Sequence, residues 1–206
     1  MQLVVEPFDL LGIFTNGIVQ LLTLKVNTVG HFPIYRTLLY GKFNRIWYFY
    51  QSMKQRIYID TSVIGGYYDT EFEVPTKQLF ERIVNKDFIV YFSEVNETEL
   101  EFAPEHIKAV KNLIPTDCIK HIEIDDEVEV LTQAYITERA LGKASENDAY
   151  HIALASVNRL DCLISWNFKH IVNFDKIKMF NSINLRLGYP LIDIRSPLEF
   201  LKNDNN

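Results

Sequence analysis

Five short apolar runs alternate with longer stretches of helical character along residues 54–201. The runs lie at 56–60, 88–92, 119–124, 162–165 and near 191–194. Helices are expected at 61–68, 75–86, 94–102 and 104–113, at 174–187, and starting near Asp125 and Ser145. Strands that alternate with helices predict an α/β domain with a largely parallel sheet. Ligands of such sheets collect at the carboxyl ends of the strands, so the residues that follow each run are the first candidates for a site.

The first run, in "RIYIDTSVIGGYYD", ends on an acid, Asp60. A charged group at the edge of a core is costly unless it is paired. The sequence therefore predicts that a cation or another polar group lies beside Asp60.

A second acid is expected to face inward from the helix that follows the second run. On a helical wheel with Val95 at 0°, the apolar residues of 95–103, which include Phe102 and Ala103, centre at about 40°. Glu99 lies at this same angle and therefore in the middle of the apolar face. The other glutamates of this segment fall on the opposite side. Glu99 either pairs at the protein surface, with a lysine for example, or faces the same cleft as Asp60.

Two further polar residues occupy comparable positions. In "SENDAYHIALA", Asp148 lies at the edge of an apolar helix face, but it could equally complete an imperfect capping box with Ser145. For this helix alone, the capping interpretation is favoured. In "CLISWNFKHI", Asn167 follows a buried strand as Asp60 does, and it could be a turn residue or a metal ligand.

Taken together, these residues predict a metal site. Carboxylates gathered at one edge of a sheet repel one another unless they are protonated or bridged by cations. Hard oxygen ligands of this kind suit Mg²⁺ or Mn²⁺. Asp60 is therefore expected to be paired with a metal ion, and Glu99, Asp148 and Asn167 are further candidates for the site.

At these residues the chain resembles the PIN-domain family of metal-dependent nucleases, in particular the VapC-like toxins of toxin–antitoxin pairs. The resemblance spans about residues 54–201 and rests on five segments in order: "IYIDTSVIGG", "VYFSEVNETEL", "ASENDAYHIALA", "DCLISWNFKHI" and "NSINLRLGYPLIDIRSPLEFL". It implies a three-layer α/β sandwich with a central, mostly parallel sheet. It divides the chain into an extension at 1–52, a nuclease domain at 53–201 and a frayed tail at 202–206.

The resemblance also implies roles for individual residues. Asp60, Glu99 and Asp148 match the family's acids and would hold Mg²⁺ or Mn²⁺, while the hydroxyl of Ser62 would support Asp60. Asn167 stands where members often have a further aspartate. This departure removes one negative charge, which argues against a second tightly held metal more than against the first.

The implied activity is hydrolysis of RNA phosphodiester bonds that leaves a 3′ hydroxyl and a 5′ phosphate. The implied partners are an RNA substrate and a small antitoxin protein, and members of the family commonly form homodimers. His151 is expected to pack or to form hydrogen bonds within the helix layer more than to take part in catalysis. His170 could contact RNA, although this is not its favoured role, and Trp166 is expected to pack and not to stack on a base.

Two rival functions remain at the level of sequence. A haloacid-dehalogenase-like phosphatase would need a second acid two residues after Asp60, where this chain has Ser62. A non-catalytic PIN-like binding module is favoured by Asn167 and disfavoured by the three intact acids.

Charge and composition place further limits. Residues 1–52 hold four Lys/Arg and two Asp/Glu (+2), and residues 53–206 hold 17 and 25 (−8), which together give −6. An acidic domain is a poor general binder of nucleic acid, so metal ions would have to neutralise the phosphates.

The apolar stretch at 10–24 is too short for a membrane span. Two cysteines without zinc-ligand spacing fit a reduced cytoplasmic protein. Met53 directly precedes the domain, which suggests that translation starts there.

Overall fold

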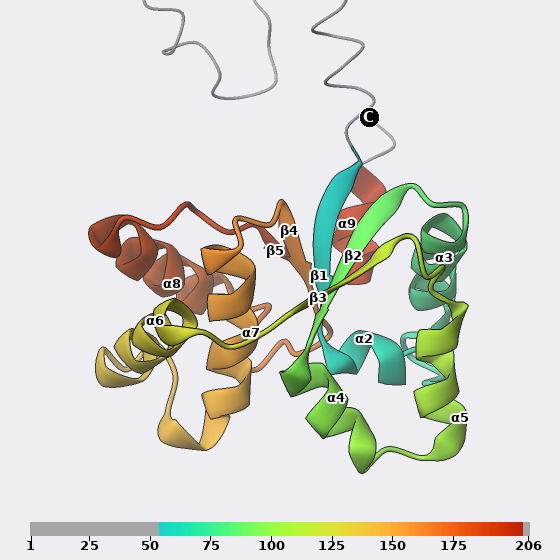
Figure 1. Cartoon of the computed structure of the whole chain (residues 1–206), viewed down its shortest axis with the longest axis horizontal. Helices are drawn as coiled ribbons and strands as arrows, with labels where there is room; N and C mark the ends of the chain where they lie inside the picture. The colour runs from blue at the N-terminus through green and yellow to red at the C-terminus, as the bar shows by residue number, and fades with distance from the viewer. Residues whose placement is uncertain (1–53, 204–206) are drawn as a thin grey trace, which may run out of the picture. The chain divides into compact units, whose positions relative to one another are not determined.

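A computed structural model describes residues 54–203, and the predicted extension at 1–52 and the end of the tail lie outside this range. Five parallel strands form one sheet in the order β3-β2-β1-β4-β5 (Figure 1). The strands are β1 (Gln55–Ile59), β2 (Phe88–Ser93), β3 (Ile119–Ile122), β4 (Cys162–Ile164) and β5 (Ile194–Arg195). The prediction of an α/β fold with a parallel sheet is confirmed.

Helices connect the strands and cover the sheet. The α-helices are α2 (Thr61–Gly65), α3 (Glu73–Val84), α4 (Glu94–Glu101), α5 (Glu105–Lys108), α6 (Asp126–Thr137), α7 (Glu146–Val157), α8 (Phe174–Leu187) and α9 (Pro197–Asn203). Two 3₁₀ helices, η2 (Ala109–Leu113) and η3 (Lys143–Ser145), lie among them. Within residues 54–203, every helix is too short or too polar to cross a bilayer.

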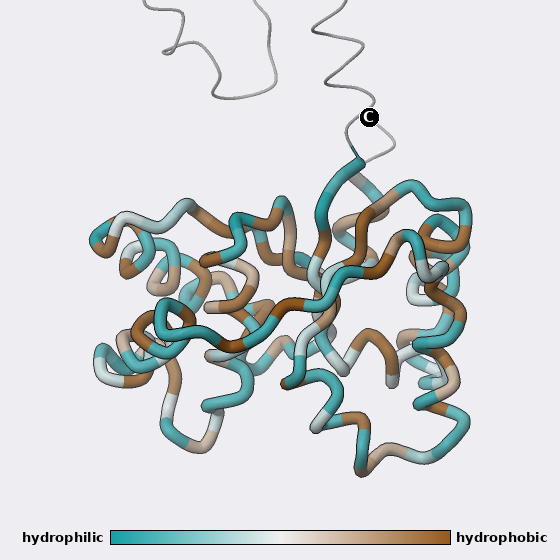
Figure 2. The backbone as a smooth tube through the Cα atoms, viewed as in Figure 1, coloured by the Kyte–Doolittle hydropathy of each residue, from teal (hydrophilic) through white to brown (hydrophobic). Residues whose placement is uncertain are grey.

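The central position of the sheet follows from side-chain alternation along its strands. On β1, Tyr58 belongs to one hydrophobic cluster, whereas Ile57 and Ile59 belong to the other. Helices α6, α7 and α8 cover the first face, and α2, α3, α5 and α9 cover the second (Figure 1). Both faces are buried, so the central strands are hydrophobic along most of their length (Figure 2). The three-layer sandwich is confirmed.

The ends of two long helices show why they form where they do. Asp125 caps α6 by accepting a hydrogen bond from the Val128 N–H at 2.9 Å. Asn173 caps α8 through the Lys176 N–H at 3.2 Å. Gly188 ends α8 in the left-handed conformation, with φ of 86°. The predicted helix at 174–187 is confirmed at both ends.

Other predicted boundaries are wrong. The first helix was expected to run to residue 68, but α2 ends at Gly65. Gly65 and Gly66 are adjacent, and glycine is a poor helix former, so the helix ends there. Packing requires glycine at position 66, because a Cβ atom there would lie 2.8 Å from the indole of Trp166. Phe102, expected on the apolar face of α4, is 86% exposed because the helix ends at Glu101 and the chain turns away.

At the carboxyl end, the last strand is β5 at 194–195, a few residues later than predicted. Helix α9 was not predicted, and it includes Lys202 and Asn203, which were expected to belong to a frayed tail. A capping box starts this helix. The Ser196 Oγ accepts from the Glu199 N–H, and a Glu199 carboxylate oxygen accepts from the Ser196 N–H at 2.9 Å.

Candidate active site

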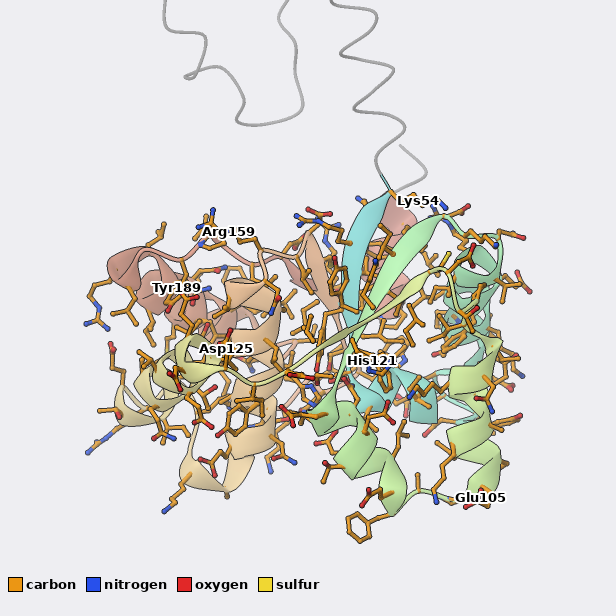
Figure 3. All side chains as sticks on the ribbon, in the orientation of Figure 1. Lys54, Glu105, His121, Asp125, Arg159 and Tyr189 are labelled. Carbon is orange, nitrogen blue, oxygen red and sulfur yellow. The ribbon has the colours of Figure 1, made fainter. Side chains whose placement is uncertain are left out.

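The predicted site residues follow three neighbouring strands of the sheet. In Figure 3, Lys54 marks the end at which β1 begins, and Asp60 follows the opposite end of this strand. Glu99 lies on α4, which starts directly after β2, and Asn167 follows β4. Because β1 lies between β2 and β4, the carboxyl ends of these strands bring the three residues to one edge of the sheet.

Asp60 is 3% exposed, and both of its carboxylate oxygens are held. Oδ1 accepts hydrogen bonds from the backbone N–H of Ser62, at 2.8 Å, and from the Ser62 hydroxyl. Oδ2 accepts from the Ser165 hydroxyl at 2.5 Å. The contact predicted between Ser62 and Asp60 is therefore present. Burial raises the pKa of Asp60, although the charge of His151 and these hydrogen bonds oppose the shift.

Glu99 is partly buried and accepts three hydrogen bonds. The donors are the Thr61 hydroxyl at 2.5 Å, the Asn147 amide at 3.1 Å and the His151 Nε2–H at 3.2 Å. Burial would raise the pKa of Glu99, but the hydrogen bond and charge of His151, together with Thr61 and Asn147, outweigh it and lower the pKa to about 2. Glu99 therefore faces the cluster, as its position on the helical wheel indicates.

His151 connects Glu99 to a buried polar network. It is 2% exposed, and its Nδ1 lies 2.7 Å from the hydroxyl of Tyr58. Tyr58 in turn donates to Asn96 Oδ1 at 2.9 Å and contacts the Ser93 hydroxyl at 2.6 Å. Sequence reasoning expected hydrogen bonding by His151 within the helix layer but missed its contact with Glu99. The sequence does carry one signal that His151 belongs near the site. It follows Asp148 by three residues and therefore lies one helical turn further along the same face.

Asp148 is tied to Asn167 and not to a helix cap. The Asn167 amide donates to Asp148 Oδ1 at 2.7 Å. Ser145 directly precedes α7 but makes no side-chain capping hydrogen bond, so the capping box favoured from the sequence is not formed. Burial raises the pKa of Asp148, while the charges of His170 and His151 and a side-chain hydrogen bond from Ser145 oppose the shift. The charge of Glu99 adds to it. Asn147, the residue before Asp148, donates to Glu99 at 3.1 Å, so α7 brings Asp148 next to a residue that contacts Glu99.

Hydrogen bonds link Asp60, Asn167 and Asp148 through Ser165, and Glu99 is bonded to the sequence neighbours of two of them, Thr61 and Asn147. Ser165, which donates to Asp60, accepts from the Asn167 N–H at 2.8 Å, and Thr61, next to Asp60, donates to Glu99. In residues 54–203, however, no three His, Cys, Asp or Glu side chains are arranged as a ready metal-binding group. The oxygen donors are those that Mg²⁺ or Mn²⁺ takes, and each carboxylate keeps lone pairs beyond its hydrogen bonds. The chemistry of the donors thus fits a divalent cation, although their arrangement is not a preassembled coordination shell.

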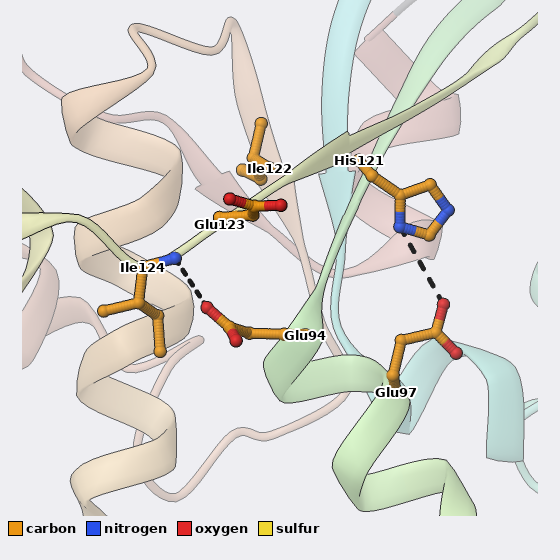
Figure 4. Close-up of a pocket in the computed structure, with 6 residues that line it drawn as sticks. All are labelled: Glu94, Glu97, His121, Ile122, Glu123 and Ile124. Atoms are coloured by element: carbon orange, nitrogen blue, oxygen red, sulfur yellow. Dashed lines mark hydrogen bonds and ion pairs between the residues drawn. The ribbon is translucent and has the colours of Figure 1, made fainter.

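A surface pocket of about 430 Å³ lies between α4 and β3, away from the predicted residues (Figure 4). Two of its three acids are already engaged. Glu94 accepts from the Ile124 N–H at 2.7 Å, while Glu97 pairs with Lys111 and lies 3.9 Å from His121 Nδ1. The lining residues are Glu94, Glu97, His121, Ile122, Glu123 and Ile124. The acid cluster around Asp60 remains the candidate active site.

Comparison with known proteins finds structural similarity only. No protein-family model matches the chain, and no curated protein sequence matches it. Among solved structures, VapBC2 from Rickettsia felis, bound to a DNA fragment from its promoter, is similar with a TM-score of 0.46 and 12% identity. FitAcB from Neisseria gonorrhoeae is similar with a TM-score of 0.45 and 16% identity. Each similarity covers 69% of this chain and 98% of the other. Similarity at this level carries no information about activity.

Proposed function

We propose that the chain is a metal-dependent ribonuclease that hydrolyses RNA phosphodiester bonds and acts as the toxin of a toxin–antitoxin pair. The observation that carries the proposal is that Asp60, Asn167 and Asp148 are linked by hydrogen bonds through Ser165, and that Glu99 is held beside them by Thr61 and Asn147. It lies at the carboxyl ends of β1, β2 and β4, where α/β sheets bind their ligands.

Asp60, Glu99 and Asp148 would hold Mg²⁺ or Mn²⁺. When bound, the ion supplies positive charge for a phosphate oxygen and a water of lowered pKa. The same ion offsets the negative charge of the domain, which would otherwise repel RNA.

The surrounding side chains hold the acids in place. Ser62 and Ser165 orient the two oxygens of Asp60. Thr61, Asn147 and His151 fix Glu99, and Asn167 fixes Asp148. Such partners keep carboxylates oriented, so little reorganisation opposes binding of the ion or the reaction.

A cleavage assay with the full chain tests the proposal. A mixed pool of single-stranded RNA is incubated with Mg²⁺, with Mn²⁺ or with EDTA. We expect cleavage with either metal, none with EDTA, and a fall of about 100-fold or more for Asp60→Asn, because a ligand contributes at least as much as its supporting partners. Asp161→Asn is the matched control, since Asp161 pairs with Arg56 at the other end of β1 and β4.

Equal cleavage by Asp60→Asn and the parent would refute the site. If neither protein cleaves RNA and Mn²⁺ does not stabilise the parent, the chain is better described as a non-catalytic binding module. In that case the loss of metal binding and cleavage is explained by Asn167, a neutral residue that is hydrogen-bonded to Asp148.

The toxin role adds a protein partner. An antitoxin would restrain the nuclease through a basic residue that reaches the acid cluster. The matching test in cells is growth arrest on expression, relieved by the product of a neighbouring gene. Harmless expression would count against the toxin role and leave the nuclease activity to the cleavage assay.

A further inference from the structure

The connection between β4 and α8 is fixed to the acid cluster. Asn167 donates to Asp148, and its own Oδ1 accepts from the His170 N–H at 3.0 Å. The carbonyl of Asn167 accepts from the N–H groups of Ile171 and Val172 at 2.9 and 2.8 Å. Residues 167–172 therefore form a closed turn beside the candidate active site.

An aromatic ring on this turn is half open to solvent and supported from within the protein. Phe168 is 48% exposed, and its ring centroid lies 5.9 Å from that of Trp166 and 6.4 Å from that of Phe72. Trp166 is 8% exposed, stacks on Phe72 at 4.5 Å and donates its indole N–H to Thr76 at 2.9 Å. Phe168 thus offers an apolar surface on a rigid base, which is the form of a platform for base stacking.

Positive groups lie on the same turn and at the start of α8. Lys176 Nζ is 3.0 Å from His170 Nδ1. Because an ammonium group can only donate, His170 Nδ1 accepts, and the ring hydrogen is on Nε2, where it can be donated. Residues 166–178 contain three lysines and one aspartate (+2), although the whole chain is at −6.

We infer that Phe168, His170 and Lys176 form a subsite for single-stranded RNA. Phe168 stacks on a base, and Lys176 with His170 binds the backbone phosphate next to the one that is cleaved. The inference rests on the proposed function for its choice of RNA. A single strand is required because the bases of a duplex are already stacked and paired, which leaves no free face for Phe168.

The experiment measures binding and cleavage separately. Asp60→Asn protein, full length and in Mg²⁺, is titrated into a labelled single-stranded RNA of about 12 nucleotides, a length within the usual site sizes. Adding Phe168→Ala is expected to weaken binding about 5- to 100-fold, the usual loss for one stacked base. Phe168→Tyr keeps the ring and should keep the affinity. Phe102→Ala removes another exposed phenylalanine, on the segment after α4, and should leave the affinity unchanged.

The phosphate contact has its own measurement. Lys176→Gln should reduce the slope of log affinity against log salt by about 0.7, the value for one phosphate contact on a single strand. Lys120→Gln removes the same charge from the exposed surface of β3, at the other edge of the sheet, and should leave the slope unchanged. Double-stranded RNA of the same sequence should compete poorly.

The outcomes separate the two proposals. Suppose that the parent cleaves RNA but that Phe168→Ala, in the Asp60→Asn protein, does not weaken RNA binding. The proposed subsite is then wrong, although the proposed nuclease activity is supported. The exposed ring of Phe168 would in that case be available for contact with a protein partner. If neither the Asp60→Asn protein nor the parent in Mg²⁺ binds single-stranded RNA, the subsite is overturned as well. If binding depends on Phe168 but the parent does not cleave, the subsite belongs to a binding module. Thermal unfolding of each variant without RNA confirms that it is folded.

Discussion

Asp60 and Glu99 are both withdrawn from water, yet their surroundings shift the two pKa values in opposite directions. For Asp60, burial outweighs its hydrogen bonds and raises the pKa. For Glu99, burial is outweighed by His151, Thr61 and Asn147, and the pKa falls to about 2. The ionised form of Glu99 therefore stabilises the fold, whereas the ionised form of Asp60 costs stability.

Acid titration should reveal the contribution of Glu99. Its folded pKa of about 2 lies below the unfolded value of roughly 4.3, so the stability that it contributes is complete above the unfolded value. This stability is lost as the pH falls from about 4.3 through 2. Glu99→Gln should lower the free energy of unfolding at pH 7 by about 1–2 kcal/mol. On acidification, the free energy of unfolding of this variant should fall by less than that of the parent. Urea unfolding between pH 7 and 2.5 measures both quantities.

Glu101→Gln is the control, because Glu101 is exposed on the same helix and should leave the acid profile of the parent unchanged. An identical profile for Glu99→Gln and the parent would contradict the proposed role of the Glu99 contacts. At this scale, periodicity could predict that Glu99 faces inward. It could not predict Thr61, Asn147 or His151 as partners, since they come from other elements and depend on how α4 and α7 pack.

The end of helix α2 shows how tertiary packing can require one residue type at one position. The sequence "TSVIGGYYD" is compatible with a longer helix, but the indole of Trp166, 100 residues later, lies against Gly66. Boundaries set by local chemistry were more predictable, as for α8, where Asn173 and Gly188 close both ends. Helix α9 had an equally local signal, since Ser196 and Glu199 are three residues apart, and that signal was overlooked.

Two adjacent glycines give a matched test of this packing. A Cβ on Gly66 would lie 2.8 Å from Trp166 and 3.0 Å from Thr76 Oγ1, whereas one on Gly65 would meet nothing within 4 Å. Gly66→Ala should displace the indole and lower the free energy of unfolding by about 1–3 kcal/mol. Gly65→Ala should be neutral or stabilising by up to about 1 kcal/mol, because alanine suits a helix. Equal urea midpoints for the two variants would show that the indole is not held against α2.

At the scale of the whole domain, the acid cluster joins elements from both faces of the sheet. Helix α7 packs in the cluster on one face, α2 packs in the cluster on the other, and α4 contributes Val95 to one and Leu100 to the other. The alternation of short apolar runs with helices predicted the parallel sheet, and the resemblance to a known family implied the three layers. The sequence did not predict the hydrogen bonds that link Asp60 to Ser165 and Asp148 to Asn167, because each joins side chains of different elements.

A cation held by this cluster should stabilise the domain as one unit. A ligand at 100 times its Kd adds about 2.7 kcal/mol to the free energy of unfolding. For a domain of this size that corresponds to a rise in Tm of roughly 5–11 °C in a single transition. Asp60→Asn should lose the Mn²⁺ response, yet in EDTA it should be as stable as the parent or more so. Asparagine caps α2 as well as aspartate does, and the repulsion between ionised acids is reduced. Asp161→Asn is the control and should keep the full response to Mn²⁺. If Asp60→Asn also kept its response, the cation would have to bind elsewhere.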